Sequence, residues 1–454
     1  MSLPHLMPSQ APPPPPPLNH TAPKTIAIIG GGWSGCHTAL ELATAGYSVT
    51  ILEKGRDLFS GVSGQFGIRI HRGPHYPRSS GTRESCRRDF SRFTSKYHEL
   101  VVPVNPAVYS LARYDSTGRE SKVSAHAFGD VCQESAHCSA ANVGEFVREN
   151  SDESQVECAY KLDEPCAFLN PYLKTYFRER LSAAGVGLRV NTEVVEVKKW
   201  HEAQGQGQGK HCVLTSDAHE CYDAVVNATG YMSVLPDGLL TNLPINADIR
   251  YQACIALHYK DSKSDPRDAP LSFIVMDGWF PCLMPSVGEP GSRGEYVLTH
   301  GAYTILGSFE TPAHATQCLS DMTSAFMETE IKPRIESEME RFWPGFTDQF
   351  VYQGWKGSVM PKMVTDTEFR SSVVFENEGV IYIFPGKISN VVEAADEVLE
   401  LLEEGGGRVT KQAGYAYARD SELTRSKREI EQRPIAKERN TCFLQTQQKL
   451  ALRV

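Results

Sequence analysis

The sequence contains no run of about 18 apolar residues, so it predicts no membrane-spanning helix. Its first 23 residues include six consecutive prolines but no apolar segment like that of a signal peptide, and we expect a disordered proline-rich tail. No CxxC pair occurs among the twelve cysteines, and the spacing of His137 and Cys138 fits no usual zinc pattern, so we expect no metal site. These absences predict free thiols in a reducing compartment, the cytoplasm.

Positive charge is also in deficit, because 46 lysines and arginines stand against 55 aspartates and glutamates, a formal net charge of -9. That balance argues against a general nucleic-acid binder. The 454 residues are enough to bury a large core and to form two structural domains. We therefore expect a two-domain globular protein with no nucleic-acid partner and no membrane span.

The sequence does contain a complete strand–helix–strand unit near its start. Residues 25–29 are mostly β-branched or apolar and predict a buried strand. A helix with an apolar face is expected from about residue 33 to 45, and a second strand from 48 to 52. Between the first strand and the helix lie glycines in GxGxxG spacing, which makes the unit far more specific than the glycines alone.

At each of these positions there is a chemical reason for glycine. Gly30 allows the tight turn after the strand, Gly32 lets the backbone approach a pyrophosphate, and Gly35 lets the helix pack closely on the sheet. The helix start offers free N–H groups and a positive dipole end to the phosphates. Glu53, at the end of the second strand, can accept hydrogen bonds from both ribose hydroxyls, and its charge would repel a 2′-phosphate.

The rest of the chain predicts a mixture of helices and strands. Residues 170–184 are expected to form a helix, with Asn170 at its cap and Pro171 in its first turn. From residue 248 to about 309, strand follows strand, which predicts an antiparallel sheet in a separate domain. A strand at 380–384 precedes a turn and an amphipathic helix, 391–402.

In this order the pieces resemble the glutathione-reductase-type FAD-dependent oxidoreductases, in the branch of amine oxidases, amino-acid oxidases and UDP-galactopyranose mutase. The unit at 25–53 looks like the family's site for the ADP part of FAD. Gly73-Pro74-His75 looks like a mutase segment near the flavin, and NATGY at 227–231 like the second glycine strand at the pyrophosphate. Val194 matches a position whose backbone pairs with adenine, and 379–402 resembles the closing segment beneath the flavin.

The resemblance implies an α/β fold, with a Rossmann-like FAD-binding domain around a parallel sheet and a substrate domain on a mostly antiparallel sheet. FAD is expected to bind noncovalently. The expected division is a tail at 1–23, an FAD-binding domain at 24–85, 170–245 and 350–405, a substrate domain at 86–169 and 246–349, and a polar extension at 406–454. The expected cofactor-binding residues are Gly30, Gly32, Ser34, Gly35, Glu53, Lys54, Ser63, Gly64, Gln65, Val194, Thr229, Gly230, Gly386, Asn390 and Val391.

The closing segment departs from several family patterns. Residues 385–390 lack the GHxxxG-type turn of amino-acid oxidases and the GDAAH motif of aromatic hydroxylases. No second GxGxxG-like site follows the first, which argues against tightly held NADPH and leaves a transient visit by NAD(P)H open. Gly386 is expected where the backbone passes close to the flavin ring, and a helix beginning near Asn390 would present its first N–H groups to the flavin. Lys387 either adds a charge there or faces water.

Two residues are the catalytic candidates. His75 either accepts or orients a substrate proton, or packs beneath the flavin through its backbone. Lys356 lies where several amine oxidases bring a basic residue over the flavin, and the alternative is a surface lysine. Arg69 and Arg72 hold either a substrate carboxylate or a structural salt bridge. The aromatic residues expected either to line the substrate pocket or to pack in the core are Tyr251, Trp279, Phe280 and Tyr303.

The main functional hypothesis is an FAD-dependent oxidoreductase that oxidises a C–N or C–H bond of a small metabolite, with the flavin as hydride acceptor. An NAD(P)H-using flavin monooxygenase and a mutase with no net redox change remain as alternatives. A flavin-free scaffold is a fourth possibility, and the intact Glu53 and glycines speak against it. The substrate and the oligomeric state stay open.

Overall fold

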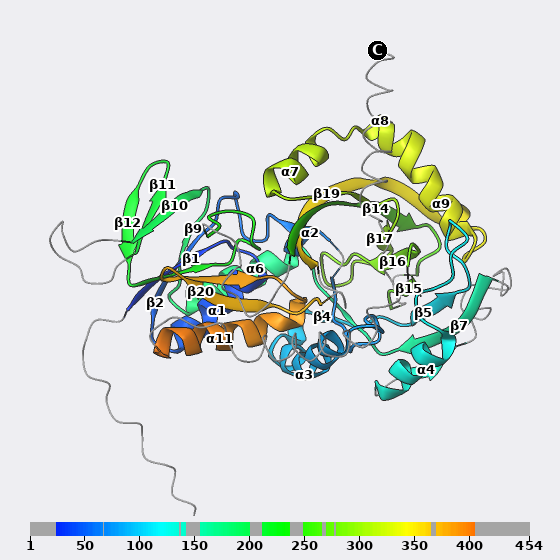
Figure 1. The fold of residues 1–454 in the computed structure, drawn as a ribbon, viewed down its shortest axis with the longest axis horizontal. Coiled ribbons are helices and arrows are strands. Elements are labelled where there is room, and N and C mark those ends of the chain that lie inside the picture. The colour runs from blue at the N-terminus through cyan, green and yellow to red at the C-terminus, as the bar shows by residue number, and fades with distance from the viewer. Residues whose placement is uncertain are drawn as a thin grey trace, which may run out of the picture.

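The computed structural model describes residues 24–66, 68–135, 138–141, 155–199, 211–236, 248–265, 269–276, 278–364 and 369–404. The predicted tail at 1–23, the extension at 406–454 and His137 lie outside the described residues. The described chain forms two large sheets that lie side by side, with helices along their outer faces (Figure 1). Two small three-stranded sheets complete the fold.

The first large sheet has six strands in the order β20–β21–β13–β1–β2–β9. Its pairs are parallel except for β20, which runs antiparallel to β21. Because parallel strands end at the same edge, the carboxyl ends of β1, β2, β13 and β21 converge there. The bounds are β1 Thr25–Ile29, β2 Ser48–Leu52, β9 Gly187–Arg189, β13 Ala224–Asn227, β20 Val373–Asn377 and β21 Val380–Phe384.

Alternate residues of β1 face opposite sides of this sheet, as the period of a strand requires. Ile26 and Ile28 join a buried cluster with apolar residues of the helices α1 (Trp33–Thr44), α6 (Tyr172–Ala183) and α11 (Val391–Glu404). Ala27 and Ile29 join a second cluster. That cluster includes apolar residues of the small meander β10 (Val194–Lys199), β11 (His211–Thr215) and β12 (His219–Tyr222). The strand is therefore buried on both faces.

The second large sheet has nine strands and is mostly antiparallel. Its main path is β18–β14–β17–β16–β15–β5–β7–β6, and β19 also pairs with β14. The pair β15–β5 is parallel. The bounds are β5 Ala107–Ala112, β6 Cys138–Ala140, β7 Val156–Leu162, β14 Asp248–Asp261, β15 Ser272–Met276, β16 Pro281–Pro285, β17 Glu295–His300, β18 Ile305–Phe309 and β19 Phe350–Val364.

Helices cover the outer faces of both sheets (Figure 1). The long helix α3 (Ser80–Lys96) packs against α11 beneath the first sheet, and α7 to α9 arch over the second. Within the described residues no helix combines the length and apolar character needed to cross a membrane. The bounds of the remaining helices are α2 Val62–Gln65, η1 His98–Leu100, α4 Ala125–Glu134, α7 Pro312–Ser320, α8 Ser324–Phe326, η4 Met327–Ile331, α9 Lys332–Glu340, α10 Phe346–Gln349 and η5 Ile388–Asn390. The second small sheet consists of β3 Ile68–Arg69, β8 Cys166–Ala167 and β4 Val101–Val102.

The predicted fold class is confirmed, with a parallel sheet beside a mostly antiparallel one. The expected helix cap at Asn170 is wrong, because α6 has Pro171 as its N-cap and the Asn170 amide instead donates to the carbonyl oxygen of Phe59 at 3.0 Å. The domain division stays a prediction. Two elements cross its limits, since β19 pairs along β14 and α3 begins before residue 86.

The expectation of free thiols is wrong for one pair of cysteines. Cys212 on β11 and Cys221 on β12 are direct partners in the antiparallel register, and they form a disulfide. They are nine positions apart in the sequence. Their proximity depends on the hairpin register, which cysteine spacing alone does not reveal.

Candidate active site

A cavity of about 640 Å³ lies where the carboxyl ends of the parallel strands meet β19. Gly30 follows β1, Glu53 follows β2, Thr229 follows β13 and Gly386 follows β21, and all four line the cavity. Residues 359–363 of β19 form the opposite wall. Crevices at the carboxyl ends of parallel strands are where open α/β sheets bind ligands.

The start of α1 faces this cavity without a local partner for its N–H groups. Gly32 is the N-cap residue, no side chain caps the helix, and the first turn contains no acidic residue. The intrahelical ladder opens with the N–H of Cys36, which donates to the carbonyl oxygen of Gly32 at 2.9 Å. The earlier N–H groups and the helix dipole together suit a diphosphate.

The three glycines of the loop have different neighbours. Gly30 has φ +104°, and a Cβ there would lie 2.8 Å from the carbonyl oxygen of Ala228. A Cβ on Gly35 would lie 1.9 Å from the carbonyl oxygen of Gly30, so this glycine serves helix packing and lies outside the cavity lining. A Cβ on Gly32 would meet only Ser63 Oγ, at 3.3 Å. A side chain at Gly32 would therefore enter the cavity rather than the protein core.

Glu53 is held rigidly at the end of β2. Its Oε2 accepts from the N–H of Gly31 at 2.6 Å, and its Oε1 accepts from the N–H of Gly55 at 2.6 Å. Each carboxylate oxygen keeps a second lone pair, which leaves room for a hydroxyl donor. Together with the uncapped start of α1, this carboxylate gives the cavity the donor and acceptor set that FAD requires at its diphosphate and ribose. The other predicted residues along this part of the wall are Ser34, Lys54, Ser63, Val194, Thr229 and Gly230.

Two predicted cofactor residues near α2 lie outside the lining. Gly64 is buried, and a Cβ there would lie 2.2 Å from the carbonyl oxygen of Phe59. The Gln65 side chain donates to the carbonyl oxygen of Ser60. Both residues therefore shape the loop that carries Ser63, which does line the cavity.

The turn after β21 also differs from its predicted role. Gly386 and Val391 line the cavity, but Asn390 does not: its side chain accepts from the N–H of Lys387 and donates to Ser85 and Asp89 on α3, each at 2.7 Å. A Cβ on Gly386 would lie 2.1 Å from the backbone nitrogen of Ser372. Contact with the chain itself is therefore sufficient to require glycine at this position.

Opposite the β2 end, the cavity has a wall of cationic side chains. Among the described residues that line the cavity, the carboxylates are Glu53 and Glu193, which lie at the ends of β2 and of the loop before β10. Lys54 adjoins Glu53, and four further cationic side chains line the rest of the cavity. We call this set the basic wall, and it consists of Arg69, Lys362, Arg370 and Lys387.

Arg69 is held by a buried chain of hydrogen bonds. Its Nη1 donates to Tyr109 Oη at 2.8 Å, and the Tyr109 hydroxyl donates to Glu164 Oε2 at 2.5 Å. Glu164 is fully buried, so desolvation raises its pKa, while the charge of Arg69 opposes that shift. The neighbouring Arg72 points elsewhere, because its guanidinium pairs with Asp163 at 2.9 Å.

His71, rather than the predicted His75, reaches the cavity. Its Nδ1 lies 3.4 Å from Glu164 Oε2. Glu164 already accepts from Tyr109 and from the N–H of Arg72, so we assign the proton to His71 Nδ1, which makes Nε2 of the neutral ring an acceptor. Burial, and then the charge of Arg69, lowers the pKa of His71 well below its usual value. His75 stacks behind it, with ring centroids 4.7 Å apart, and does not line the cavity.

Lys387 lies in the basic wall, whereas the predicted Lys356 does not. The Nζ of Lys387 is 4.3 Å from the centre of the Tyr76 ring, and burial, followed by the charge of Arg69, lowers the pKa of Lys387 to about 7. Lys356 is exposed on β19, where it pairs in register with Ala256, and it is not part of the lining. The structure thus brings a different lysine from the predicted one to the cavity.

The aromatic residues expected in a substrate pocket pack elsewhere. Tyr251 donates to the carbonyl oxygen of Tyr231 at 3.1 Å, Phe280 packs on Phe342, and Tyr303 stacks on His300. Trp279 lies beneath the guanidinium of Arg119. None of the four lines the cavity, whose apolar lining includes Phe66, Met232, Met360, Pro361, Met363 and Phe369.

Residues 25–386 match the family DAO, described as FAD dependent oxidoreductase. The chain belongs to this family. The match covers the glycine loop, Glu53, both large sheets and every residue of the basic wall except Lys387. It confirms the predicted FAD cofactor and the predicted enzyme class. The uncapped helix start and Glu53 remain the predicted site for the diphosphate and ribose of FAD.

Two relatives of this FAD-dependent oxidoreductase are themselves named as FAD-dependent enzymes. The chain is 44% identical over 427 residues to the FAD-dependent monooxygenase kojA of Aspergillus flavus, covering 93% of this chain and 96% of that protein. It is 26% identical over 394 residues to the FAD-dependent monooxygenase FPY4 of Fusarium mangiferae, covering 84% and 92%.

Solved structures share the fold at low identity. Glycine oxidase from Geobacillus kaustophilus aligns with a TM-score of 0.60 at 15% identity, covering 85% of this chain and 97% of that one. L-proline dehydrogenase from P. horikoshii aligns with a TM-score of 0.58 at 18% identity, covering 88% and 98%. These likenesses concern the architecture alone.

Proposed function

We propose that this FAD-dependent oxidoreductase is a monooxygenase that acts on a small metabolite with an acidic group. The observation that carries the proposal is the 44% identity, over 93% of the chain, to a protein named as an FAD-dependent monooxygenase. In the reaction, substrate, O₂, NAD(P)H and one proton give hydroxylated substrate, water and NAD(P)⁺. Bound FAD supplies the electron transfer between nicotinamide and oxygen.

The basic wall supports the acidic character of the substrate. Arg69 is held in place through Tyr109 and Glu164, so its guanidinium is a fixed donor for a carboxylate or an enolate oxygen. Lys387 has a pKa of about 7, so its neutral form is present near pH 7 and can accept a substrate proton. Nε2 of His71 offers a second acceptor in the same wall.

The absence of a second GxGxxG motif in the sequence supports a transient visit by NAD(P)H rather than a dedicated nicotinamide domain. The nicotinamide would then reach the flavin through the FAD cavity and leave before the substrate reacts.

An oxidase that removes hydrogen from a C–N or C–H bond is the second candidate. The basic wall would hold an amino-acid carboxylate equally well, and the architecture is shared with glycine oxidase. Oxygen labelling separates the two reactions, because an oxidase reduces O₂ to H₂O₂ and leaves no oxygen atom from O₂ in the product.

We expect NAD(P)H to bleach the flavin of the purified holoenzyme under anaerobic conditions. Under ¹⁸O₂, a panel of small enols, phenols and carboxylates is then screened with NAD(P)H by mass spectrometry. The proposal predicts a product with one ¹⁸O atom and one NAD(P)H oxidised for each product formed. A product that has lost two hydrogens, with equimolar H₂O₂ and no label, would contradict it in favour of the oxidase, and an unlabelled isomer would favour a mutase.

A further inference from the structure

The meander β10–β12 carries a cluster of metal-ligand side chains outside the FAD cavity. We propose that Cys212, His219 and Cys221 form a Zn²⁺ site when the two cysteines are reduced, and that the disulfide closes this site. The proposal concerns the fold of the meander and is independent of the monooxygenase proposal. Its ligand set is two thiolates and one imidazole, which suits Zn²⁺.

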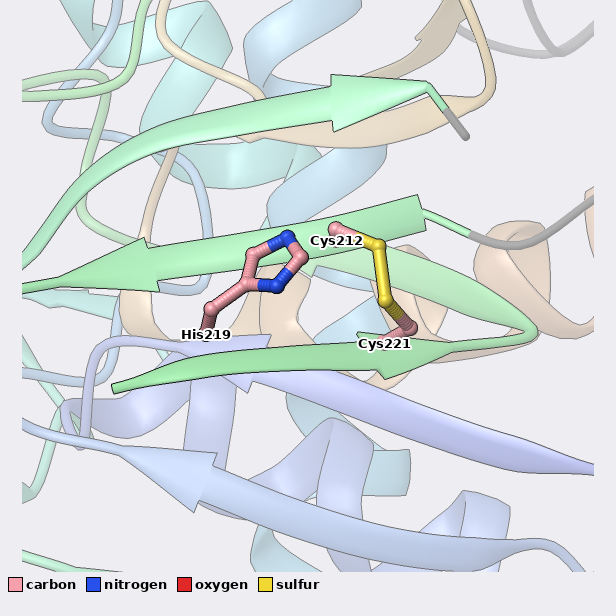
Figure 2. A group of neighbouring side chains, drawn as sticks. All are labelled: Cys212, His219 and Cys221. Carbon is pink, nitrogen blue, oxygen red and sulfur yellow. A yellow bond between two sulfur atoms is a disulfide. The ribbon is translucent and has the colours of Figure 1, made fainter. Parts of the chain in front are cut away.

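The strand geometry places the three side chains on one face. Cys212 of β11 and Cys221 of β12 are register partners, and cross-strand partners project to the same side. His219 precedes Cys221 by two positions on β12, so it shares that side as well. Figure 2 shows the imidazole beside the disulfide, between the two strands, and the three ligand atoms lie within 4.8 Å of one another.

After reduction the three ligand atoms would be near enough to bind one ion, since they lie within 4.8 Å of one another. With Zn–S bonds of about 2.3 Å and a Zn–N bond of about 2.0 Å, ligand atoms around a tetrahedral ion lie roughly 3.5–3.8 Å apart. Only side-chain rotation is needed to reach that spacing once the bond between the sulfurs is broken. While the disulfide is intact, neither sulfur is available as a thiolate.

The surroundings favour a site that opens to solvent on one side. Cys212 is buried, Cys221 is half-buried and His219 is exposed. A cation would therefore enter past the imidazole and rest against the sheet, and water would complete a four-coordinate ion. The three ligands are brought together by the pairing of β11 with β12. They do not form one of the usual zinc-binding sequence motifs, so their spacing alone does not reveal them.

The switch between the two forms balances in atoms and electrons. A dithiol reductant donates two electrons and two protons, so the disulfide of Cys212 and Cys221 becomes two thiols and the reductant becomes a disulfide. Binding of Zn²⁺ then releases the two thiol protons, and His219 contributes a ring nitrogen. Reducing conditions thus open the site and oxidising conditions close it.

The test measures zinc on the FAD-loaded protein after reduction and anaerobic removal of the reductant. Competition with a chromophoric chelator should show one equivalent of bound Zn²⁺ that is absent from the oxidised protein. Co²⁺ in place of Zn²⁺ should give the visible bands of a tetrahedral thiolate site, beyond the flavin absorbance. Both signals should be lost in Cys221→Ser and strongly weakened in His219→Gln.

Two substitutions elsewhere serve as matched controls. Cys158→Ser removes another half-buried thiol, and His98→Gln removes another exposed imidazole; both should keep the full equivalent. The FAD content reports folding in each variant. A reduced protein that binds no Zn²⁺, or Cys221→Ser and His219→Gln proteins that bind it as the parent does, would overturn the proposal.

Discussion

Replacing Gly32 with valine should give a folded protein that no longer retains FAD. A Cβ at this position meets only Ser63 Oγ, so the substitution leaves the core intact and fills the space in front of the first turn of α1. The diphosphate then loses its approach to the free N–H groups. The measurement is the flavin absorbance of the purified protein, together with its circular dichroism and melting temperature beside those of the FAD-free parent.

A glycine outside the cavity provides the control. Gly185 follows α6, has φ +71°, and a Cβ there would meet nothing within 4 Å, so Gly185→Asn should keep its flavin. Asparagine tolerates this left-handed conformation better than most residues do. Full flavin content in Gly32→Val would show that this loop does not hold the diphosphate.

Replacing Lys387 with methionine should lower turnover by about 100-fold or more, the effect typical of losing a general base. The pKa of Lys387 is about 7, and its neutral form accepts the proton, so the parent's rate should rise as the pH increases through about 7. The methionine variant should lack that rise. The measurement is the initial rate of substrate-dependent NAD(P)H oxidation between about pH 5.5 and 8.5.

Lys356→Met is the matched control, because that lysine is exposed on β19 and does not line the cavity. Its rate and pH profile should equal those of the parent. Folding of the Lys387 variant is checked separately: the pKa of Lys387 is lower in the folded chain than in the unfolded one, so its charged form disfavours folding at pH 6. At pH 6 the melting temperature of the methionine variant should therefore be no lower than that of the parent. A pH profile of the rate that is unchanged in this variant would exclude Lys387 as the base.

The unit at 25–53 is predictable from the sequence because all of its signals are local. The apolar strands, the glycine spacing and Glu53 lie within a single βαβ segment, and β1, α1 and β2 form within a residue of the expected bounds. The part of the second sheet between residues 248 and 309 is predictable for a similar reason, since apolar strand patterns follow one another there.

The basic wall depends on contacts that no local pattern contains. His71 and Glu164 are 93 residues apart, and their hydrogen bond is what distinguishes His71 from the neighbouring His75. Arg69 and His71 are two positions apart in the apolar–polar alternation that predicts a short strand here, and this spacing is a signal that could have pointed to both, although β3 itself ends at Arg69. Lys387 lines the cavity and Lys356 does not, because Lys387 follows β21 and Lys356 lies within β19. Which part of each strand meets the cavity depends on how the two sheets pack, and no local sequence pattern contains that information.

We expect FAD to lie along the cavity from the start of α1 to the turn after β21. Amide hydrogen exchange of the FAD-loaded and FAD-free protein, followed by mass spectrometry, measures this placement. Exchange should be slower with FAD in peptides covering 30–36, 228–233 and 386–391, and equal in 281–300, which forms β16 and β17. Protection confined to 30–36, with unchanged exchange in 386–391, would contradict it.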